Sequence, residues 1–380
     1  MKCYLYIFIF LISLKNENNK KRDISSDKNK QIFSFIEDLD IFKYANEIEN
    51  DTLLIFRLTY YVLNEILGKD NIRKIVDETK LYNFLVKLAQ EYNSNTYPKM
   101  NPYHNLFHAA DVVYSLYIYL SKSKYTNPLL FTDTYIKRKE ELEFTSKINY
   151  KDLDIFALII AAACHDFRHT GRDNNFYLTY KDKVPFANIL KEFDYKLEFY
   201  HFSESKKLIE EYGLLDNLNE FEKERFFKIM KLAIYSTDNS LNKNHVENMR
   251  KYKDIMNLKE IKEMDQIYDD AKLEMFECFL HAADISNPTK GKKNFIIWTN
   301  KFNEEYCEQT KEINLYDSSK KVECIGKDEK KFREFEKLFF KYIVDVFFIP
   351  FCEIFEQLNY LCENYQKNKN FIEGTEKIFD

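Results

Sequence analysis

The feature that most limits the fold of this chain is its shortage of turn-forming residues. Six glycines and six prolines are spread over 380 residues, about 3% of the chain, where roughly 12% is average. β-Sandwiches, barrels and disordered tails need more of these residues, because tight turns use them. Apolar residues recur at helical spacing from about Ile32 to Phe371, with no linker between them. We therefore predict an all-α fold, a compact domain of many helices.

This pattern predicts one domain over residues 31–371. An N-terminal segment of residues 1–30 precedes it, and a short C-terminal tail of residues 372–380 follows. Length alone would also allow two domains, but no change in composition marks a boundary. We therefore expect a single helical domain.

Local signals predict where some helices begin and end. Residues Leu53–Leu67 have apolar side chains at helical spacing, and Gly68 follows where a helix would stop. Phe221–Ile234 repeats this pattern on one face. The polar stretch Thr310–Lys331 is predicted to be an exposed loop.

The N-terminal segment begins with a nearly continuous apolar run at residues 4–14, followed by a polar and charged stretch. The run is shorter than the about 20 residues that span a bilayer, and no small-x-small cleavage site follows it. A helix packed on the domain and a remnant of a membrane segment are equally good interpretations. We expect a cytoplasmic catalytic domain, with membrane association through this segment left open.

Charge and cysteine content exclude some classes of protein. The net charge is −5, and no basic block exceeds Lys20–Arg22, so no nucleic-acid partner is expected. The seven cysteines are scattered and form no Cys-x-x-Cys pair. This spacing predicts neither a disulfide framework nor a cysteine-based zinc site, which is typical of a reducing compartment. The sequence does not indicate an oligomeric state.

The chemistry of the chain is concentrated in its histidines. Five of the seven fall in three short segments that also contain aspartate or asparagine. The segments are Tyr103–Asp111, His165–Gly171 and His281–Pro288. In the first two, paired histidines are four residues apart and would share a helix face if the segment is helical. Imidazole with carboxylate suits zinc, manganese or iron, and carboxylate with water suits magnesium.

The His165-Asp166 step is the most informative of these positions. It follows the apolar run Ile159–Ala163, which predicts a buried helix. A buried aspartate is costly unless a cation or hydrogen bonds compensate it. Neighbouring helical residues point about 100° apart, so Asp166 could contact two cations while His165 binds one. Such a metal pair is suited to in-line attack on a phosphate ester; the alternative is a helix-capping aspartate beside a core histidine.

These segments resemble the motifs of the class I cyclic-nucleotide phosphodiesterases, within the HD metal-dependent phosphohydrolases. The three strong matches are Tyr-His-Asn-x-x-His-Ala-Ala-Asp-Val at 103–112, His-Asp-x-x-His-x-Gly-x-x-Asn at 165–174 and His-x-x-Asp-x-Ser-Asn-Pro at 281–288. Weaker matches are Leu197-Glu198 with His201 and Ser236-Thr237-Asp238. The order and approximate spacing are those of the family over most of the chain.

The resemblance implies an all-α fold and two divalent metal ions, Zn²⁺ and Mg²⁺, with Mn²⁺ as an alternative at the second site. The implied zinc ligands are His108, His165, Asp166 and Asp284. Asp166 would also touch the second metal, and the residues that orient its waters would be His169, Glu198 and Thr237.

The same resemblance implies the reaction. A 3′,5′-cyclic nucleotide, cAMP or cGMP, would be opened to the 5′-monophosphate, which ends a cyclic-nucleotide signal. A hydroxide would attack phosphorus, and His104 would protonate the leaving 3′ oxygen. Tyr103 and Asn287 would line the nucleotide pocket.

Some positions depart from the family pattern. Arg168 replaces a frequently acidic residue and is expected to point outward; Tyr200 and Asn242 each stand where a histidine is common. Counting back from Pro350, the glutamine that binds the base would fall at Phe340, and the clamping phenylalanine at Ile343. In this register Phe340→Gln should tighten the binding of a cyclic purine nucleotide, and the choice between cAMP and cGMP is not readable.

Two other functions remain as alternatives. The first is an HD-type phosphohydrolase for another phosphate ester, although the Tyr-His-Asn and Ser-Asn-Pro segments speak against it. The second is a metal-stabilised domain that binds a cyclic nucleotide or a partner without turnover, suggested by the missing glutamine. The complete set of histidines and aspartates favours the phosphodiesterase.

Overall fold

The computed structural model describes residues 38–47, 53–93, 101–124, 128–134, 148–257, 265–319, 322–326, 328–374 and 377–378. The compact unit that holds the site spans Asp40–Asp380. The predicted N-terminal segment, residues 1–30, lies outside the described residues. Among the described helices, none is both long and apolar enough to cross a membrane.

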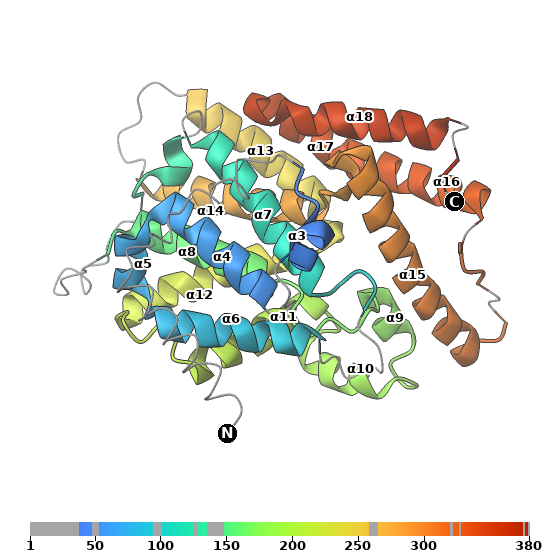
Figure 1. Ribbon diagram of the computed structural model, residues 1–380, viewed down its shortest axis with the longest axis horizontal. Coiled ribbons are helices and arrows are strands. Elements are labelled where there is room, and N and C mark those ends of the chain that lie inside the picture. The colour runs from blue at the N-terminus through green and yellow to red at the C-terminus, as the bar shows by residue number, and fades with distance from the viewer. Residues whose placement is uncertain are drawn as a thin grey trace. The chain divides into compact units, whose positions relative to one another are not determined.

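The described residues form helices joined by turns, and none of them is in a β-strand (Figure 1), which confirms the predicted all-α fold. The α-helices are α3 (Ile41–Glu47), α4 (Leu54–Leu67), α5 (Lys69–Ile75), α6 (Glu78–Asn93), α7 (Leu106–Ser123), α8 (Tyr150–Cys164), α9 (Asn174–Thr179), α10 (Pro185–Leu190), α11 (Leu197–Glu211), α12 (Glu220–Tyr235), α13 (Asn242–Asn257), α14 (Asp265–Asp284), α15 (Lys292–Tyr316), α16 (Glu329–Phe339), α17 (Asp345–Ile354) and α18 (Asn359–Glu373). Short 3₁₀ turns are η2 (Pro128–Phe131), η4 (Lys191–Phe193), η5 (Asn239–Leu241), η6 (Asn287–Thr289) and η8 (Glu356–Leu358), and η7 (Phe340–Val344) is a π-helical turn.

The predicted helix signals are confirmed where the structure describes them. The helix α4 ends at Gly68, whose backbone N–H donates to the carbonyl of Asn64. The helix α12 begins with a capping box, in which Asn219 and Glu222 each satisfy the other's backbone N–H. The predicted loop at Thr310–Lys331 is shorter than expected, because α15 continues to Tyr316 and α16 begins at Glu329.

The helix α8 is the centre of the core. Every residue of it except Lys151 is buried, so other parts of the protein cover it on nearly all sides. It packs against α12, α7 and α4, and α7 packs in turn against α14. Each large apolar side chain buried here contributes roughly 1.5–3 kcal/mol relative to exposure. The ends of α8 and α14 and the start of α7 are thereby fixed close together.

A buried ion network ties the same helices together. The Arg225 guanidinium of α12 donates to both carboxylate oxygens of Asp154 in α8, each at 2.9 Å. It also donates to both oxygens of Asp269 in α14, at 2.6 and 2.7 Å. Lys272 lies 2.6 Å from Asp154, and all four side chains are at least nine-tenths buried. The network therefore fixes α8, α12 and α14 relative to one another through charge pairs that exclude water.

Cysteine pairing differs from the sequence-based expectation. Disulfides join Cys307 to Cys324 and Cys352 to Cys362, so the prediction of no disulfides is wrong for these four residues. The pairs are separated by 17 and 10 residues, and helix packing rather than spacing brings their Cα atoms to 4.8 and 6.4 Å. The second disulfide joins α17 to α18.

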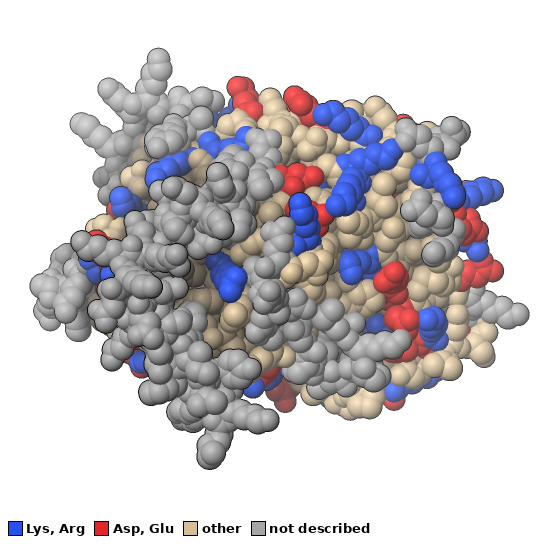
Figure 2. Space-filling view, in the orientation of Figure 1, with Lys and Arg blue, Asp and Glu red and all other residues tan. Residues whose placement is uncertain are grey.

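On the face drawn in Figure 2, basic and acidic side chains are interspersed outside the grey region. A net charge of −5 over the whole sequence agrees with this mixture. The expectation that the chain has no nucleic-acid partner stays a prediction.

The ion network makes a stability prediction. Replacing Arg225 by methionine keeps most of its volume but removes both guanidinium hydrogen bonds of Asp269, which keeps the Thr134 hydroxyl as a donor and the nearby charge of Lys272. Removing one partner of a buried pair costs about 3–5 kcal/mol, so we expect the free energy of unfolding in urea to fall by that amount. Arg250→Met, at an exposed position of α13, is the matched control and should change it by less than about 0.5 kcal/mol. Equal effects of the two substitutions would contradict the role of the network.

Candidate active site

Four predicted metal ligands meet where three helices end or begin. His108 lies in the first turn of α7, His165 caps the end of α8, Asp166 follows it, and Asp284 is the last residue of α14. Their ligand atoms all lie within 4.8 Å of one another. His108 Nε2 is 2.9 Å from Asp284 Oδ1 and 3.4 Å from His165 Nε2. Segments more than a hundred residues apart in the chain are thus brought to one point.

The hydrogen bonding of these side chains leaves donor atoms that could bind a cation. The His165 Nδ1–H donates to the carbonyl of Ala162 at 2.8 Å, so Nε2 is the ring nitrogen that faces the other three predicted ligands. Asp166 Oδ2 is buried and accepts no hydrogen bond in the described part of the chain. Two imidazole nitrogens at 3.4 Å with two carboxylates around them form a donor set of the kind that binds zinc.

The carboxylates of the cluster stay ionised. Burial by itself would raise the pKa of Asp284, but hydrogen bonds from His108 and His165 hold that pKa well below the usual range of an aspartate. For Asp166, burial is likewise outweighed by the charge of His165, so its pKa is also lowered. Ionised carboxylates are the form that coordinates metals.

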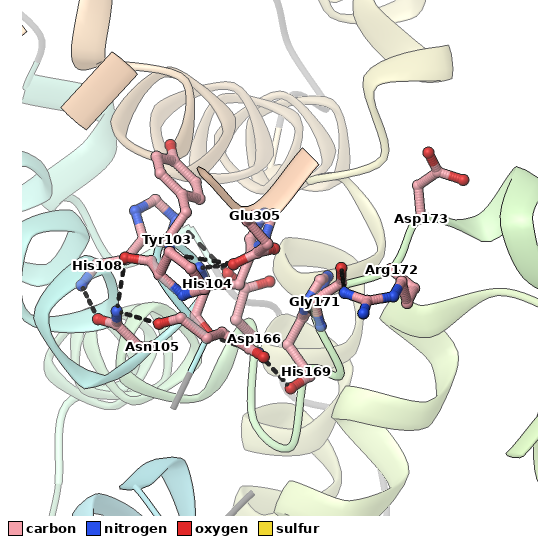
Figure 3. A network of polar contacts seen from close by, with 12 residues as sticks. Tyr103, His104, Asn105, His108, Asp166, His169, Gly171, Arg172, Asp173 and Glu305 are labelled. Atoms are coloured by element: carbon pink, nitrogen blue, oxygen red, sulfur yellow. Dashed lines mark hydrogen bonds and ion pairs between the residues drawn. The ribbon is translucent and has the colours of Figure 1, made fainter. Parts of the chain in front are cut away.

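A second group of polar side chains surrounds His104. The His104 Nδ1–H donates to the Glu305 carboxylate of α15, which also accepts the backbone N–H groups of Tyr103 and His104 at 2.9 Å each. Figure 3 shows the dashed contacts that join Glu305 to this segment. Burial disfavours a charged ring, but Glu305, Asp166 and Asp284 together outweigh it and raise the pKa of His104 to about 9. His104 is therefore protonated at neutral pH.

His169 lies against His104 but stays neutral. The two rings stack with their centroids 3.9 Å apart. Burial lowers the pKa of His169, and the neighbouring charge on His104 lowers it further. Its Nδ1 accepts the backbone N–H of Gly171 at 2.9 Å, so the proton of the neutral ring is on Nε2.

The loop that carries His165, Asp166 and His169 is held in a strained conformation. Arg168 has a φ of 61°, a left-handed value that only glycine adopts freely. Its guanidinium pairs with Glu91 of α6 and Glu204 of α11, and Arg168 Nε donates to Glu91 at 2.7 Å. Gly171 has a φ of 72°, and a Cβ there would lie 2.8 Å from Asn101 Oδ1. Ion pairs and one obligatory glycine thus fix the loop.

A pocket opens beside these two groups. Its walls include Tyr103, His104, Asp284, Asn287, Pro288, Thr299, Phe302, Phe335, Glu336 and Phe339. The Asn287 amide donates to the Tyr103 hydroxyl at 2.5 Å, and Asn287 Oδ1 is buried without a partner in the described residues. The pocket therefore combines aromatic walls with unsatisfied polar groups beside the metal-binding cluster.

Comparison with known proteins now identifies the family. A family model described as 3′5′-cyclic nucleotide phosphodiesterase matches residues 103–365, more than half of the chain. The chain belongs to this family. The matched region contains the four predicted metal ligands, His104 and the walls of the pocket, and the family is metal-dependent.

Curated relatives of this chain are much longer. It is 26% identical over 287 residues to a probable 3′,5′-cyclic-AMP phosphodiesterase of Caenorhabditis elegans, covering 73% of this chain and 37% of that protein. It is 28% identical over 275 residues to the dual specificity calcium/calmodulin-dependent 3′,5′-cyclic nucleotide phosphodiesterase 1C of Mus musculus, covering 71% and 33%. The chain thus spans about a third of the length of these relatives.

A solved structure confirms the fold. The phosphodiesterase domain of the rhodopsin phosphodiesterase from Salpingoeca rosetta superimposes with a TM-score of 0.68 at 21% sequence identity. The match covers 93% of this chain and 96% of that one. At this identity the likeness concerns the fold alone.

The other side chains of the predicted site and the weaker motifs make the following contacts. His201 stacks on His169 at 5.4 Å and donates through Nδ1–H to the carbonyl of Phe167 at 2.7 Å. Glu198 accepts hydrogen bonds from Asn174, and burial raises its pKa to about 7. The Thr237 hydroxyl donates to the carbonyl of Ile234 at 2.9 Å. That His169, Glu198 and Thr237 orient metal-bound waters stays a prediction.

The predicted base-binding residues are not brought to the pocket. Phe340 is buried against Phe295 and Tyr365, and the backbone carbonyl of Ile343 accepts from Asn242. The pocket is lined instead by α16, one helical turn earlier, through Glu336 and Phe339. The π-helical turn η7 lies between these pocket-lining residues and Pro350.

The paired histidines also differ from the expected geometry. His104 precedes α7 and His169 follows α8, so neither pair shares a helix face. Among the departures from the family, Arg168 points outward as expected, with its side chain 40% exposed. Asn242 Oδ1 accepts the Nε2–H of His281 at 2.8 Å, which satisfies that buried ring nitrogen.

Sequence reasoning missed Glu305 and Glu336. Both lie in helices with many exposed charged side chains, so neither stands out in the sequence. No signal in the sequence marks Glu305, because its contact with His104 joins residues 201 positions apart in the chain. Burial is what separates these two glutamates from their neighbours, and burial comes from tertiary packing.

The ligand set makes a prediction about metal binding. Asp284→Asn keeps the shape of the side chain but removes one ionised ligand. Losing a residue that only orients a metal ligand lowers metal affinity by about 10- to 100-fold. Losing a ligand itself should therefore lower the zinc affinity by more than that. The measurement is a competition titration with a fluorescent chelator, together with metal content after dialysis. Asp270→Asn, at an exposed position of α14, is the matched control and should leave both unchanged. Equal zinc affinity in the two variants would remove Asp284 from the ligand set.

Proposed function

We propose that this chain hydrolyses a 3′,5′-cyclic nucleotide, cAMP or cGMP, to the 5′-monophosphate with the help of Zn²⁺ and Mg²⁺, Mn²⁺ being an alternative at the second site. The observation that carries the proposal is the meeting of His108, His165, Asp166 and Asp284 beside a pocket that also exposes His104. Membership of the phosphodiesterase family supports the same reaction. Such hydrolysis would end a cyclic-nucleotide signal.

The residues of the cluster would hold the cations. His108, His165, Asp166 and Asp284 would bind one, and Asp166 would be shared with a second. Bound there, divalent ions would polarise the phosphate and lower the pKa of water. The pocket lies beside the cluster, so a phosphate ester that enters it comes within reach of both His104 and Asp284.

His104 has the properties of the proton donor. Its Nδ1 is occupied by Glu305, so Nε2 is the nitrogen that can give a proton to a group in the pocket. Its raised pKa keeps that proton in place at neutral pH. Glu305 would also stabilise the charged ring until the proton is transferred to the departing 3′ oxygen.

The two alternative functions can be weighed against this arrangement. Another phosphohydrolase would need the metal cluster but has no evident use for the aromatic pocket with its Tyr103–Asn287 hydrogen bond. A domain that binds without turnover would not need a charged His104 held by a buried carboxylate. Because the chain spans only part of its relatives, partners and regulation of a longer protein stay open, as does membrane association.

The decisive experiment is hydrolysis of cAMP and cGMP by the zinc- and magnesium-loaded protein, with the product identified by chromatography. We expect 5′-monophosphate, no activity after chelation, and recovery when metal is restored. His104→Asn should lower kcat by about 10²- to 10⁴-fold, because it removes the proton donor, while its metal content stays unchanged. Binding without hydrolysis would favour the binding domain, and phosphate release from a noncyclic ester would favour the other phosphohydrolase.

The His104–Glu305 pair predicts the pH profile. The raised pKa of about 9 means that the donor form is lost only as pH rises through that value. Glu305→Gln removes the negative charge, so the alkaline limb of kcat should move at least about one pH unit lower. Glu304→Gln, the exposed neighbour on α15, should leave the profile in place. An unchanged alkaline limb in Glu305→Gln would show that Glu305 does not set the protonation of His104.

A further inference from the structure

Arg168 stands in the loop of residues 166–171, at a position where the family frequently has an acidic residue. Its guanidinium reaches beyond this loop to two helices. It pairs with Glu91 of α6 and with Glu204 of α11, and Arg168 Nε donates to Glu91 at 2.7 Å. A single side chain therefore ties the loop to both helices.

The charge balance of the two carboxylates does not depend on Arg168 alone. Glu91 has a second cation in Lys87, whose Nζ lies 2.9 Å from it. Glu204 has a second cation in Lys207, whose Nζ donates to it at 2.7 Å. Compensation of buried charge is thus available from α6 and α11 themselves. What Arg168 adds is the connection to the loop.

Tyr200, the other departure from the family pattern in this region, lies beside the same guanidinium. Burial raises the pKa of Tyr200, and so does the charge of Glu204, whereas the charge and a hydrogen bond of Arg168 oppose that rise. The Tyr200 ring is also packed edge-on against Phe186 and Phe193. The two departures therefore belong to one contact between the loop and α11.

A candidate cation site lies between the same loop and the same helix. Asp166, His169 and His201 each offer a ligand atom, and these atoms lie within 4.8 Å of one another. We call these three residues the second-cation group. Asp166 and His169 belong to the loop, whereas His201 belongs to α11. The group is therefore complete only while the loop and α11 keep their relative positions.

The Arg168–Glu204 pair joins these two elements beside the second-cation group. Glu204 follows His201 by three residues, so the two side chains are neighbours on the surface of α11. On the loop, Arg168 has the left-handed φ of 61°. A residue in such a conformation keeps it only where its surroundings determine it. Without the ion pairs, the loop can relax away from α11.

We propose that Arg168 is a positioning residue for the second cation. Through Glu204 it holds the loop against α11, and it thereby sets how tightly the second-cation group binds a divalent ion. This inference rests on the proposed function and adds to it a residue that touches neither substrate nor metal. Residues that only orient metal ligands change metal affinity by about 10- to 100-fold.

Charge and position make opposite predictions for this pair. Arg168→Gln removes a positive charge, which by itself can only strengthen the binding of a cation. Glu204→Gln removes a negative charge, which by itself can only weaken it. If position is what matters, both substitutions break the same tie, and both weaken binding.

The test is a titration of the zinc-loaded protein with Mn²⁺, followed by the electron paramagnetic resonance signal of the free ion. We expect the dissociation constant to rise at least about tenfold in Arg168→Gln and in Glu204→Gln. The double variant should lose no more than the weaker single variant, because the two residues act through one contact. Arg168→Lys should fall between, because an ammonium lacks the fork that reaches two carboxylates. Unchanged or tighter binding in Arg168→Gln overturns the proposal.

Lys87→Gln and Lys207→Gln are the matched controls. Each removes a positive charge from one of the same two carboxylates and leaves the loop untouched, so each should keep the Mn²⁺ affinity of the unmodified chain. A loss as large as that in Arg168→Gln would contradict the proposal, because the tie to the loop would then not matter.

Zinc content tests whether the effect is confined to the second cation. It should stay unchanged in Arg168→Gln, because the predicted zinc ligands His108, His165 and Asp284 lie outside the loop that Arg168 fixes. Parallel loss of zinc and manganese overturns the proposal, since Arg168 would then maintain the whole cluster rather than position the second-cation group.

Hydrolysis separates this inference from the proposed function. In Arg168→Gln, the Mg²⁺ concentration for half-maximal hydrolysis of cAMP should rise, while KM for the nucleotide stays unchanged, because Arg168 is not among the residues that line the described pocket. A protein that hydrolyses neither cyclic nucleotide but shows the expected loss of Mn²⁺ affinity refutes the proposed function and supports the role of Arg168. A protein that hydrolyses them with equal Mn²⁺ affinity in all variants does the reverse.

Discussion

The burial of two aspartates at one point is the constraint on which the arrangement of the central helices depends. Asp166 and Asp284 are ionised in a largely apolar interior, which is tolerable only because His108 and His165 lie against them. That contact requires the start of α7 and the ends of α8 and α14 to meet. Helix ends suit such a site, because side chains there can converge without interrupting a helix.

The loop beside this site has a strained backbone, and helices outside the core hold it in that conformation. Arg168 keeps its left-handed backbone because Glu91 in α6 and Glu204 in α11 fix its guanidinium. On the opposite side, Asn101 donates to the carbonyls of His104 and His169 and so ties the two histidine segments together. Strain of this kind, of order 1–3 kcal/mol, persists only where the surroundings determine the conformation. The helices outside the core thus serve the geometry of the site.

How far the sequence could predict this molecule depends on the range of each interaction. Local signals were sufficient for the helical fold, because capping residues such as Asn219 and a shortage of glycine act within one element. Short motifs containing His165 and Asp166 predicted which side chains the fold brings together as a candidate metal site. Which residues of α16 line the pocket was not predictable, since the turn of a helix that faces a pocket depends on its packing against other helices. The disulfide pairing and the contact of Glu305 with His104 depend on how helices pack. The spacing of residues in the chain does not predict that packing.

Glu305 and Glu336 show why residue type alone does not assign a role in such a pocket. Both are buried glutamates, yet the charge of His104 outweighs burial and lowers the pKa of Glu305 to about 2, whereas burial alone raises that of Glu336 to about 8. One is therefore a fixed negative charge that holds a proton on its neighbour, and the other is a neutral acid that can donate a hydrogen bond. Environments that separate the pKa values of like groups are how a single site obtains different acid–base functions. Here one glutamate holds a proton on His104, and the other is a neutral acid in the wall of the pocket that His104 also lines.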